Sequence, residues 1–301
     1  MIRRSWLPVS AEVQLPLLTV TGAAPGPTLA VTAGVHGDEY EGVRAIFETV
    51  ETLDAAQLRG TLLAVPVVNP PAHRAVRRLS PIDNLNLARV FPGNPAGSIS
   101  ERIAHVLAEN VIRKADFYLD LHSGGVRFAM PSMAGYASFD PRGRASAEAF
   151  GAPVIWGHPV IEPGRTISVA HAENIPFLYT EAWGAGRIAP DDLAMCRRGI
   201  VNILRHLGML PGSPDIPHPP RRLSGVGNTD DGLAAGHDGF LILETRLLDK
   251  VQAGQSLGRL VDPLGRTLET YAAPRAGTVA LTHEMPIVEK GDTLFLLADE
   301  E

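Results

Sequence analysis

The sequence contains very little cysteine. Cys196 is the single cysteine among 301 residues, so no internal disulfide framework can form. Proteins of oxidising compartments commonly depend on such bonds, and their absence is typical of a reducing compartment. The thiol falls in residues 191–207, which have the pattern of a helix, and we expect it to be packed inside the protein rather than to act as a nucleophile.

The sequence also lacks an excess of positive charge and any long apolar run. Lysine and arginine number 27 against 33 acidic residues, a net charge of −6, which gives no basic footprint for nucleic acid. No run approaches the roughly 18 apolar residues of a membrane span. Pro8 and Glu12 interrupt what would be the apolar core of a signal peptide. We therefore expect a cytoplasmic protein that binds neither nucleic acid nor membrane.

The sequence is long enough for one large domain or two unequal ones. Residues 211–220 are rich in proline and form the clearest linker. They divide the chain into a catalytic domain, residues 1–212, and a C-terminal domain, residues 221–301. We expect a β-sandwich or barrel in the second, because short strands there alternate with glycine turns. The predicted C-terminal strands are 239–245, 255–261, 277–282 and 292–297.

Before the linker, apolar strands alternate with helical patterns, which implies an α/β sheet covered on both faces. The expected strands are 28–33, 61–68, 117–121, 153–156 and 175–180, and the main expected helices are 38–53, 98–111 and 191–207. Ser98 and Glu101 have the spacing of a capping box. Residues 69–97 and 130–144 lack periodicity and are predicted to be loops.

Residues 31–39 carry the first functional signal. A strand rich in valine and alanine meets Gly34, and the following turn presents His36 and Glu39 three residues apart. Imidazole and carboxylate groups both suit Zn²⁺, although this pair alone is a weak signal. His122 follows a second apolar run in the same way, and Glu181 ends a third. Because ligands in open α/β sheets lie beyond the carboxyl ends of the strands, these side chains predict a two-histidine, one-glutamate zinc site.

Three motifs make a family resemblance specific. Gly34-Val-His-Gly-Asp-Glu39, Asp120-Leu-His-Ser-Gly-Gly125 and Tyr179-Thr-Glu181, in this order, resemble the succinylglutamate desuccinylase/aspartoacylase family of zinc-carboxypeptidase-like hydrolases. The resemblance extends over about residues 28 to 210. It implies a mixed sheet flanked by helices, with a smaller all-β C-terminal domain beside it.

The resemblance also implies roles for individual residues. One Zn²⁺ per chain would be held by His36, Glu39 and His122, with Glu181 as the general base. Asp120 could orient a ligand histidine by a hydrogen bond to the side of the ring away from the metal. The alternative for Glu181 is an ion pair with Arg187, because a buried carboxylate needs a partner.

The arginines of residues 69–93 resemble a loop in which one arginine polarises the scissile carbonyl and an Asn-Arg pair holds the substrate. Arg78 falls at the polarising position, with Arg77 as the alternative, and Arg89 falls on the arginine of the pair. The asparagine before it is replaced by Ala88. Either the substrate presents a different group there, or a nearby amide such as Asn86 substitutes.

The resemblance implies a zinc-dependent deacylase that removes an acyl group from a small N-acyl amino acid or related N-acetylated compound. A zinc carboxypeptidase acting on peptide C-termini and a metal-binding, non-catalytic regulatory protein remain alternatives. A C-terminal domain that crowds the cleft would exclude peptides and favour the deacylase. The oligomeric state, a homo-oligomer included, is left open.

Overall fold

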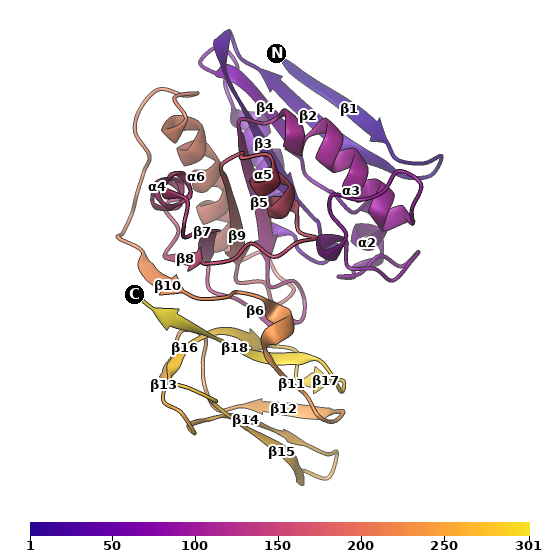
Figure 1. The fold of residues 1–301 in the computed structure, drawn as a ribbon, viewed down its shortest axis with the longest axis vertical. Coiled ribbons are helices and arrows are strands. Elements are labelled where there is room, and N and C mark those ends of the chain that lie inside the picture. Colours follow the sequence, from indigo (N-terminus) through magenta and orange to yellow (C-terminus); the bar gives the residue numbers. More distant parts are fainter.

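The structure is a computed structural model that describes all of residues 1–301. Its main element is a mixed sheet in which the strands lie in the order β1-β2-β4-β3-β5-β9-β7-β8 before the sheet continues into the C-terminal segment (Figure 1). Strands β4, β3, β5 and β9 run parallel. The strands are β1 (Ile2–Pro8), β2 (Gln14–Thr21), β3 (Ala24–Ala33), β4 (Arg59–Val65), β5 (Phe117–Ser123), β7 (Met133–Ala137), β8 (Val154–His158) and β9 (Phe177–Ala182).

Helices cover both faces of this sheet, and each face has its own core. One core joins the sheet to α1 (Glu41–Thr52), α4 (Pro141–Phe150) and α6 (Pro190–His206). The other joins it to α3 (Ile99–Asn110) and α5 (Thr166–Ala172). Along β3, Leu29 and Val31 enter the first core while Ala30 enters the second, as expected for side chains that alternate between faces. Central strands buried on both faces read as continuous apolar runs, which is why the sequence predicts them.

The C-terminal segment extends the main sheet and adds a second one. Strand β10 (Arg221–Ser224) pairs with both β8 and β18 (Thr293–Glu300), so the main sheet continues through β18 to β16 (Gly277–His283) and β13 (Lys250–Val251). The short strand β11 (Leu233–Ala234) pairs with β18, and the short strand β6 (Phe128–Ala129) pairs with β16. A separate sheet has the order β15 (Thr267–Ala272), β14 (Ser256–Val261), β12 (Gly239–Leu243) and β17 (Ile287–Val288).

These strands enclose a further apolar cluster of their own, and they form the lower lobe of Figure 1. The expected fold class, a mixed α/β sheet with helices and a separate β part, is confirmed. The division at residues 211–220 stays a prediction, because β10 follows that segment directly and yet pairs inside the main sheet.

Several local predictions are wrong. Residues 130–144, predicted to be a loop, contain the buried strand β7 and the start of α4. Strand β7, Met-Ala-Gly-Tyr-Ala, shows no clear periodicity. Gly135 is required in it because a Cβ there would lie 2.0 Å from the ring of Tyr179. The predicted strand 61–68 ends earlier, at Val65, before Pro66, which lacks the N–H that a ladder needs.

The predicted loop 69–97 also contains structure, namely α2 (Pro70–Ala75) and the 3₁₀ turn η1 (Leu87–Arg89). A second such turn, η2 (Ile112–Lys114), leads into β5, and a third, η3 (Thr229–Asp231), follows β10. Phe47 of α1 is 49% exposed, although Val43, Ile46 and Val50 of the same helix are buried. None of the helices combines the length and the apolar character needed to cross a bilayer.

The capping box predicted at the start of α3 is confirmed. The Ser98 hydroxyl accepts a hydrogen bond from the Glu101 N–H, and the Glu101 carboxylate accepts one from the Ser98 N–H at 2.8 Å. The two residues thereby satisfy two backbone donors that the first turn of a helix leaves unpaired.

We expect Ser98→Ala to lower the free energy of unfolding by about 1 kcal/mol, because it removes the side-chain acceptor of the cap. Urea unfolding with an unchanged m-value measures the loss. Ser213→Ala is the matched control, since Ser213 is exposed and lies outside helices and strands. Equal midpoints for the two variants would contradict the role of the cap.

Candidate active site

Three neighbouring parallel strands bring the predicted residues together. Strand β3 pairs with β5, and β5 pairs with β9 so that His122 lies opposite Glu181. His36 follows β3 after a turn at Gly34, whose φ of +64° is in the left-handed region that glycine adopts without strain. The carboxyl ends of adjacent parallel strands meet at one edge of the sheet, as the sequence analysis expected.

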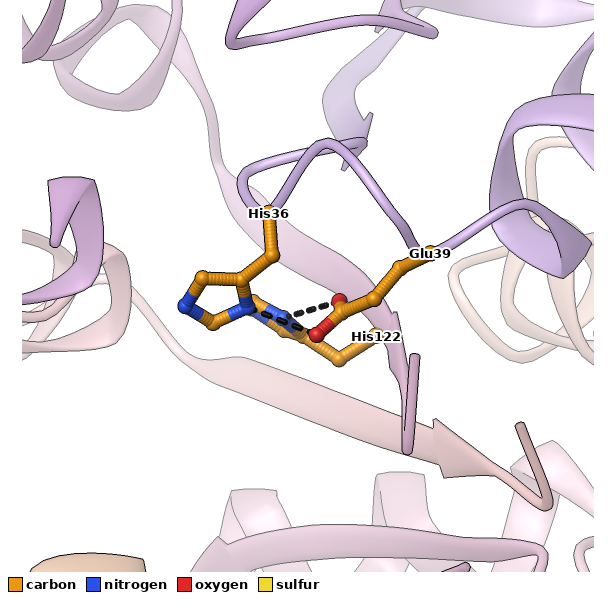
Figure 2. A group of neighbouring side chains, drawn as sticks. All are labelled: His36, Glu39 and His122. Atoms are coloured by element: carbon orange, nitrogen blue, oxygen red, sulfur yellow. Dashed lines mark hydrogen bonds and ion pairs between the residues drawn. The ribbon is translucent and has the colours of Figure 1, made fainter. Parts of the chain in front are cut away.

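His36, Glu39 and His122 form one compact cluster (Figure 2). The Nδ1 atom of His36 lies 2.6 Å from Glu39 Oε1, and the Nδ1 atom of His122 lies 2.9 Å from Glu39 Oε2. One ligand atom from each residue lies within 4.8 Å of the others. All three side chains are largely shielded from solvent.

The outer nitrogens of both imidazoles are already engaged. His122 Nε2 lies 2.9 Å from Asp120 Oδ2, and His36 Nε2 lies 3.1 Å from Asn86 Oδ1. Both partners are acceptors, so each Nε2 carries the proton, and in the neutral imidazole Nδ1 then has only a lone pair. These lone pairs face the oxygens of Glu39. Acceptors that face one another need a cation between them, and this donor set fits a divalent metal such as zinc.

The charges of the cluster are strongly coupled. Burial alone raises the pKa of Glu39, but His36 and His122 outweigh it and hold that pKa far below its usual range. Burial lowers the pKa of His122, yet Asp120 and Glu39 outweigh it and raise the pKa well above the usual value. Burial and the neighbouring Arg78 lower the pKa of His36. The cluster therefore attracts positive charge at the point between its three side chains.

Glu181 stands beside the cluster with a free oxygen. Its Oε2 is buried and has no hydrogen-bond partner, and it forms no ion pair with Arg187. Burial, followed by the charge of Glu39, raises the pKa of the Glu181 carboxyl to about 8. A carboxyl group with this pKa is largely protonated at neutral pH, and a cation bound nearby would favour its charged form.

Of the two adjacent arginines, Arg78 faces the cluster. Its Nη1 lies 3.2 Å from Glu39 Oε1 and 3.2 Å from His36 Nδ1, and the guanidinium carbon lies 5.9 Å from the ring centroid of Phe128. The side chain of Arg77 is exposed, and its backbone carbonyl accepts a hydrogen bond from Gly37.

A cavity with an empty volume of about 560 Å³ opens onto the cluster. Most of the site residues that the sequence predicts line this cavity. Its lining consists of His36, Arg78, Ala88, Arg89, His122, Met130, Arg165, Thr166, Ile167, Tyr179, Glu181, Gly227 and Thr229. Glu39 and Asn86 lie behind the wall, where they contact the two histidines.

Sequence reasoning missed Arg165 and the residues from the C-terminal segment. Arg165 lies in the turn before α5; its Nη2 donates to Asn228 Oδ1 at 2.8 Å, and its buried Nε has no partner. Gly227 and Thr229 come from beyond the linker. No short motif marks these residues, because the cavity wall forms only when distant segments meet.

The loop that follows His122 is tied to the C-terminal segment. Arg127 forms an ion pair with Asp292, with both carboxylate oxygens within 3.1 Å of Nη1. The Phe128 ring meets the ring of His283 edge-on, with centroids 5.4 Å apart, and on its other side approaches Arg78. The C-terminal segment therefore supports the loop that contacts the arginine of the site.

Comparison with known proteins agrees with this geometry. The family model described as the succinylglutamate desuccinylase/aspartoacylase catalytic domain matches residues 25–207. The chain belongs to this family. Its relatives include the N-alpha-acetyl-L-2,4-diaminobutyric acid deacetylase of Halomonas elongata, which is 34% identical over 97% of this chain and 90% of the relative.

Two solved structures of the family extend the likeness to the whole chain. The succinylglutamate desuccinylase/aspartoacylase of Rhodobacter sphaeroides has a TM-score of 0.89 at 29% identity, covering 100% of this chain and 94% of its own. The product-bound ectoine utilization protein EutE (DoeB) of Ruegeria pomeroyi has a TM-score of 0.89 at 29% identity, with 99% and 95% covered. The chain is thus a member of a family of deacylases. Relatives of known structure share both its main sheet and its C-terminal segment.

We expect Arg127→Ala to loosen the loop between His122 and β7 without unfolding the protein. The ion pair joins side chains that are 43% and 22% exposed, and such pairs contribute at most about 1 kcal/mol. Faster amide hydrogen exchange at residues 124–129 is the expected result. Arg266→Ala is the control, because it breaks the ion pair between Arg266 and Asp262 at another place in the C-terminal segment. Unchanged exchange at residues 124–129 in Arg127→Ala would show that the ion pair with Asp292 does not stabilise this loop.

Proposed function

We propose that the protein is a zinc-dependent amidohydrolase that removes the acyl group from a small N-acyl amino acid or a related N-acetylated compound. The observation that carries this proposal is that one cavity presents the His36–Glu39–His122 cluster, the Glu181 carboxylate and the Arg78 guanidinium together. Amide hydrolysis needs an electrophilic centre, a proton carrier and a donor for the developing oxyanion. The family and the Halomonas elongata deacetylase support this reading.

In this proposal His36, Glu39 and His122 would hold one Zn²⁺ per chain. The metal would supply a Lewis acid that polarises a carbonyl and lowers the pKa of water toward neutrality. Asp120 keeps the proton of His122 on Nε2, at 2.9 Å, and Asn86 does the same for His36 at 3.1 Å. Partners of this kind fix the tautomer and the orientation of ligand histidines.

Glu181 carries the proton in this mechanism. Its unpartnered Oε2 accepts a proton from the attacking water, and the same carboxyl group then donates it to the leaving amine. The raised pKa of Glu181 strengthens its affinity for that proton. A cation bound at the neighbouring cluster would lower this pKa again and keep the carboxylate available as a base.

The arginines divide the remaining tasks. Arg78, beside the cluster, donates to the oxyanion; one such donor typically contributes about 3–4 kcal/mol. We assign the substrate carboxylate to the side of the cavity where Arg89 and Arg165 lie, because guanidinium groups bind carboxylates in a planar fork. Asn86, expected to bind substrate, does not line the cavity; its Oδ1 accepts from the Ala88 N–H at 3.0 Å and faces His36 Nε2, so we assign it to positioning His36.

The two alternatives are less well supported. A carboxypeptidase needs room for a peptide, whereas Gly227 and Thr229 of the C-terminal segment help to line the cavity beside the cluster and limit the room there. A non-catalytic metal protein has no need of a buried carboxylate such as Glu181 with an unpartnered oxygen. Zinc content together with turnover of a panel of N-acetyl amino acids tests the proposal against both.

We expect His122→Ala to lose bound zinc, because the change removes one of three protein ligands. Elemental analysis of the dialysed protein measures the metal. His171→Ala is the control, since His171 is exposed on α5 and has no contact with the cluster. Full zinc occupancy in His122→Ala would reject this metal site.

We expect Glu181→Gln to keep the metal and the fold while kcat falls by about 10²–10⁴, the usual range for a group in acid–base catalysis. Glutamine preserves the shape of the side chain but cannot accept the proton. Steady-state kinetics on an N-acetyl amino acid measures the fall, with Glu162→Gln as the control for loss of one negative charge nearby. Turnover at the wild-type rate in Glu181→Gln would remove this residue from the mechanism.

A further inference from the structure

The side chain of Tyr179 is held in one place at the wall of the cavity. Tyr179 lies on β9 and lines the cavity, and its ring packs so closely on β7 that a Cβ on Gly135 would lie 2.0 Å from it. Its hydroxyl oxygen lies 2.7 Å from Nε2 of the buried His158. The ring and the hydroxyl are therefore both fixed, and the oxygen has little freedom to turn away from the site.

The hydrogen bond between Tyr179 and His158 has only one polarity. The other ring nitrogen of His158, Nδ1, lies 3.0 Å from the backbone carbonyl of Gly225, which can only accept, so Nδ1 carries a proton. Burial lowers the pKa of His158 to about 4, and the ring is neutral at physiological pH. Nε2 then has only a lone pair, and Tyr179 donates its single proton to it. The Tyr179 oxygen is thus left to act as an acceptor.

Charged donors dominate the polar lining of this cavity. The guanidinium groups of Arg78, Arg89 and Arg165 line it, and they can only donate. The Glu181 carboxylate is an acceptor, and the proposed mechanism uses it for the proton of the attacking water. Tyr179 precedes Glu181 by two residues on β9, so both side chains leave the strand on the same face. The cavity therefore has an uncharged acceptor beside the residue that carries the proton.

Substrates of the proposed class share one hydrogen-bond donor. In an N-acyl amino acid the carboxylate and the acyl carbonyl accept hydrogen bonds, whereas the N–H of the scissile amide donates. A buried donor without a partner is costly, and this nitrogen has to lie near Glu181 to receive a proton from it. We propose that the Tyr179 hydroxyl accepts a hydrogen bond from the N–H of the scissile amide. This inference rests on the proposed deacylase function.

This contact directs the leaving nitrogen. When water adds to the carbonyl carbon and gives a proton to Glu181, the nitrogen becomes pyramidal and its lone pair is no longer conjugated. An N–H held by Tyr179 turns that lone pair toward Glu181, which returns the proton to it. The oxyanion then re-forms the carbonyl, and the C–N bond breaks with its electron pair remaining on the amine. Tyr179 keeps its own proton throughout, so it orients the leaving group and does not act as an acid or a base.

The experiment compares an amide with an ester of the same shape, because an ester has oxygen in place of the N–H. The amide is the N-acetyl amino acid of the panel that the zinc-loaded wild type hydrolyses fastest; for N-acetyl-L-2-aminobutyrate the matched ester is O-acetyl-L-2-hydroxybutyrate. We expect Tyr179→Phe to lower kcat/KM on the amide by about 10- to 100-fold, the usual effect of leaving a buried donor without a partner. On the ester, which has no such donor, kcat/KM should stay nearly unchanged.

Tyr136→Phe is the matched control, because Tyr136 is a buried tyrosine on the neighbouring strand β7 and does not line the cavity; it should leave both substrates unaffected. Equal losses on the amide and the ester in Tyr179→Phe would mean that the hydroxyl only holds His158 and the cavity wall, and would overturn the inference. So would an unchanged kcat/KM on the amide, although the deacylase function would then stand. A wild type that hydrolyses no N-acetyl amino acid would instead reject the proposed function itself.

Discussion

A buried carboxylate held between two imidazole nitrogens is the interaction on which the rest of this structure depends. Glu39 is 3% exposed, with His36 Nδ1 and His122 Nδ1 at 2.6 and 2.9 Å. An uncompensated buried charge costs several kcal/mol; here the Arg78 guanidinium, 3.2 Å from Glu39 Oε1, and the two imidazoles compensate it, and outer hydrogen bonds hold both rings. The residues come from the ends of β3 and β5, whose parallel register therefore has to be maintained. Two cores, one on each face of the sheet, stabilise that register.

The C-terminal segment takes part in the site as well as enclosing it. Strand β16 pairs with β6, which follows the His122 loop, and its His283 contacts Phe128 beside Arg78. Residues 225–231 then reach the opposite side of the cavity, where they bind Arg165 and Arg89. One segment thus contacts both the part of the site that we assign to chemistry and the part that we assign to recognition. Changes in this segment can alter which amino acid is accepted without changing the cluster.

Much of the site could be predicted from the sequence because its key residues follow apolar strands that stop at glycine-bearing turns. His36, Glu39, His122 and Glu181 are all marked in this way, and the structure brings them together. Strand β7 could not be predicted, because its five residues, Met-Ala-Gly-Tyr-Ala, show no periodicity and their burial depends on neighbours such as Tyr179. Arg77 and Arg78 are indistinguishable by spacing, and only the left-handed turn at Val76, with φ of 53°, decides which one points inward. The pairing of Arg89 with Asp230 joins residues 141 positions apart, a distance over which no local pattern carries information.

We expect the charge balance at Arg89, which is paired with Asp230, to add to the selection that the size of the cavity provides. One methylene more or less in a pocket changes kcat/KM by roughly 10- to 200-fold, whereas a polar group left without its partner is rejected far more strongly. A substrate with a second carboxylate near Arg89 would have to displace Asp230 from that guanidinium or bear its repulsion, and like charges placed together cost several kcal/mol. Because the Arg89 guanidinium is already paired with Asp230 at 2.9 Å, we expect this repulsion to act on an acidic substrate whatever its size.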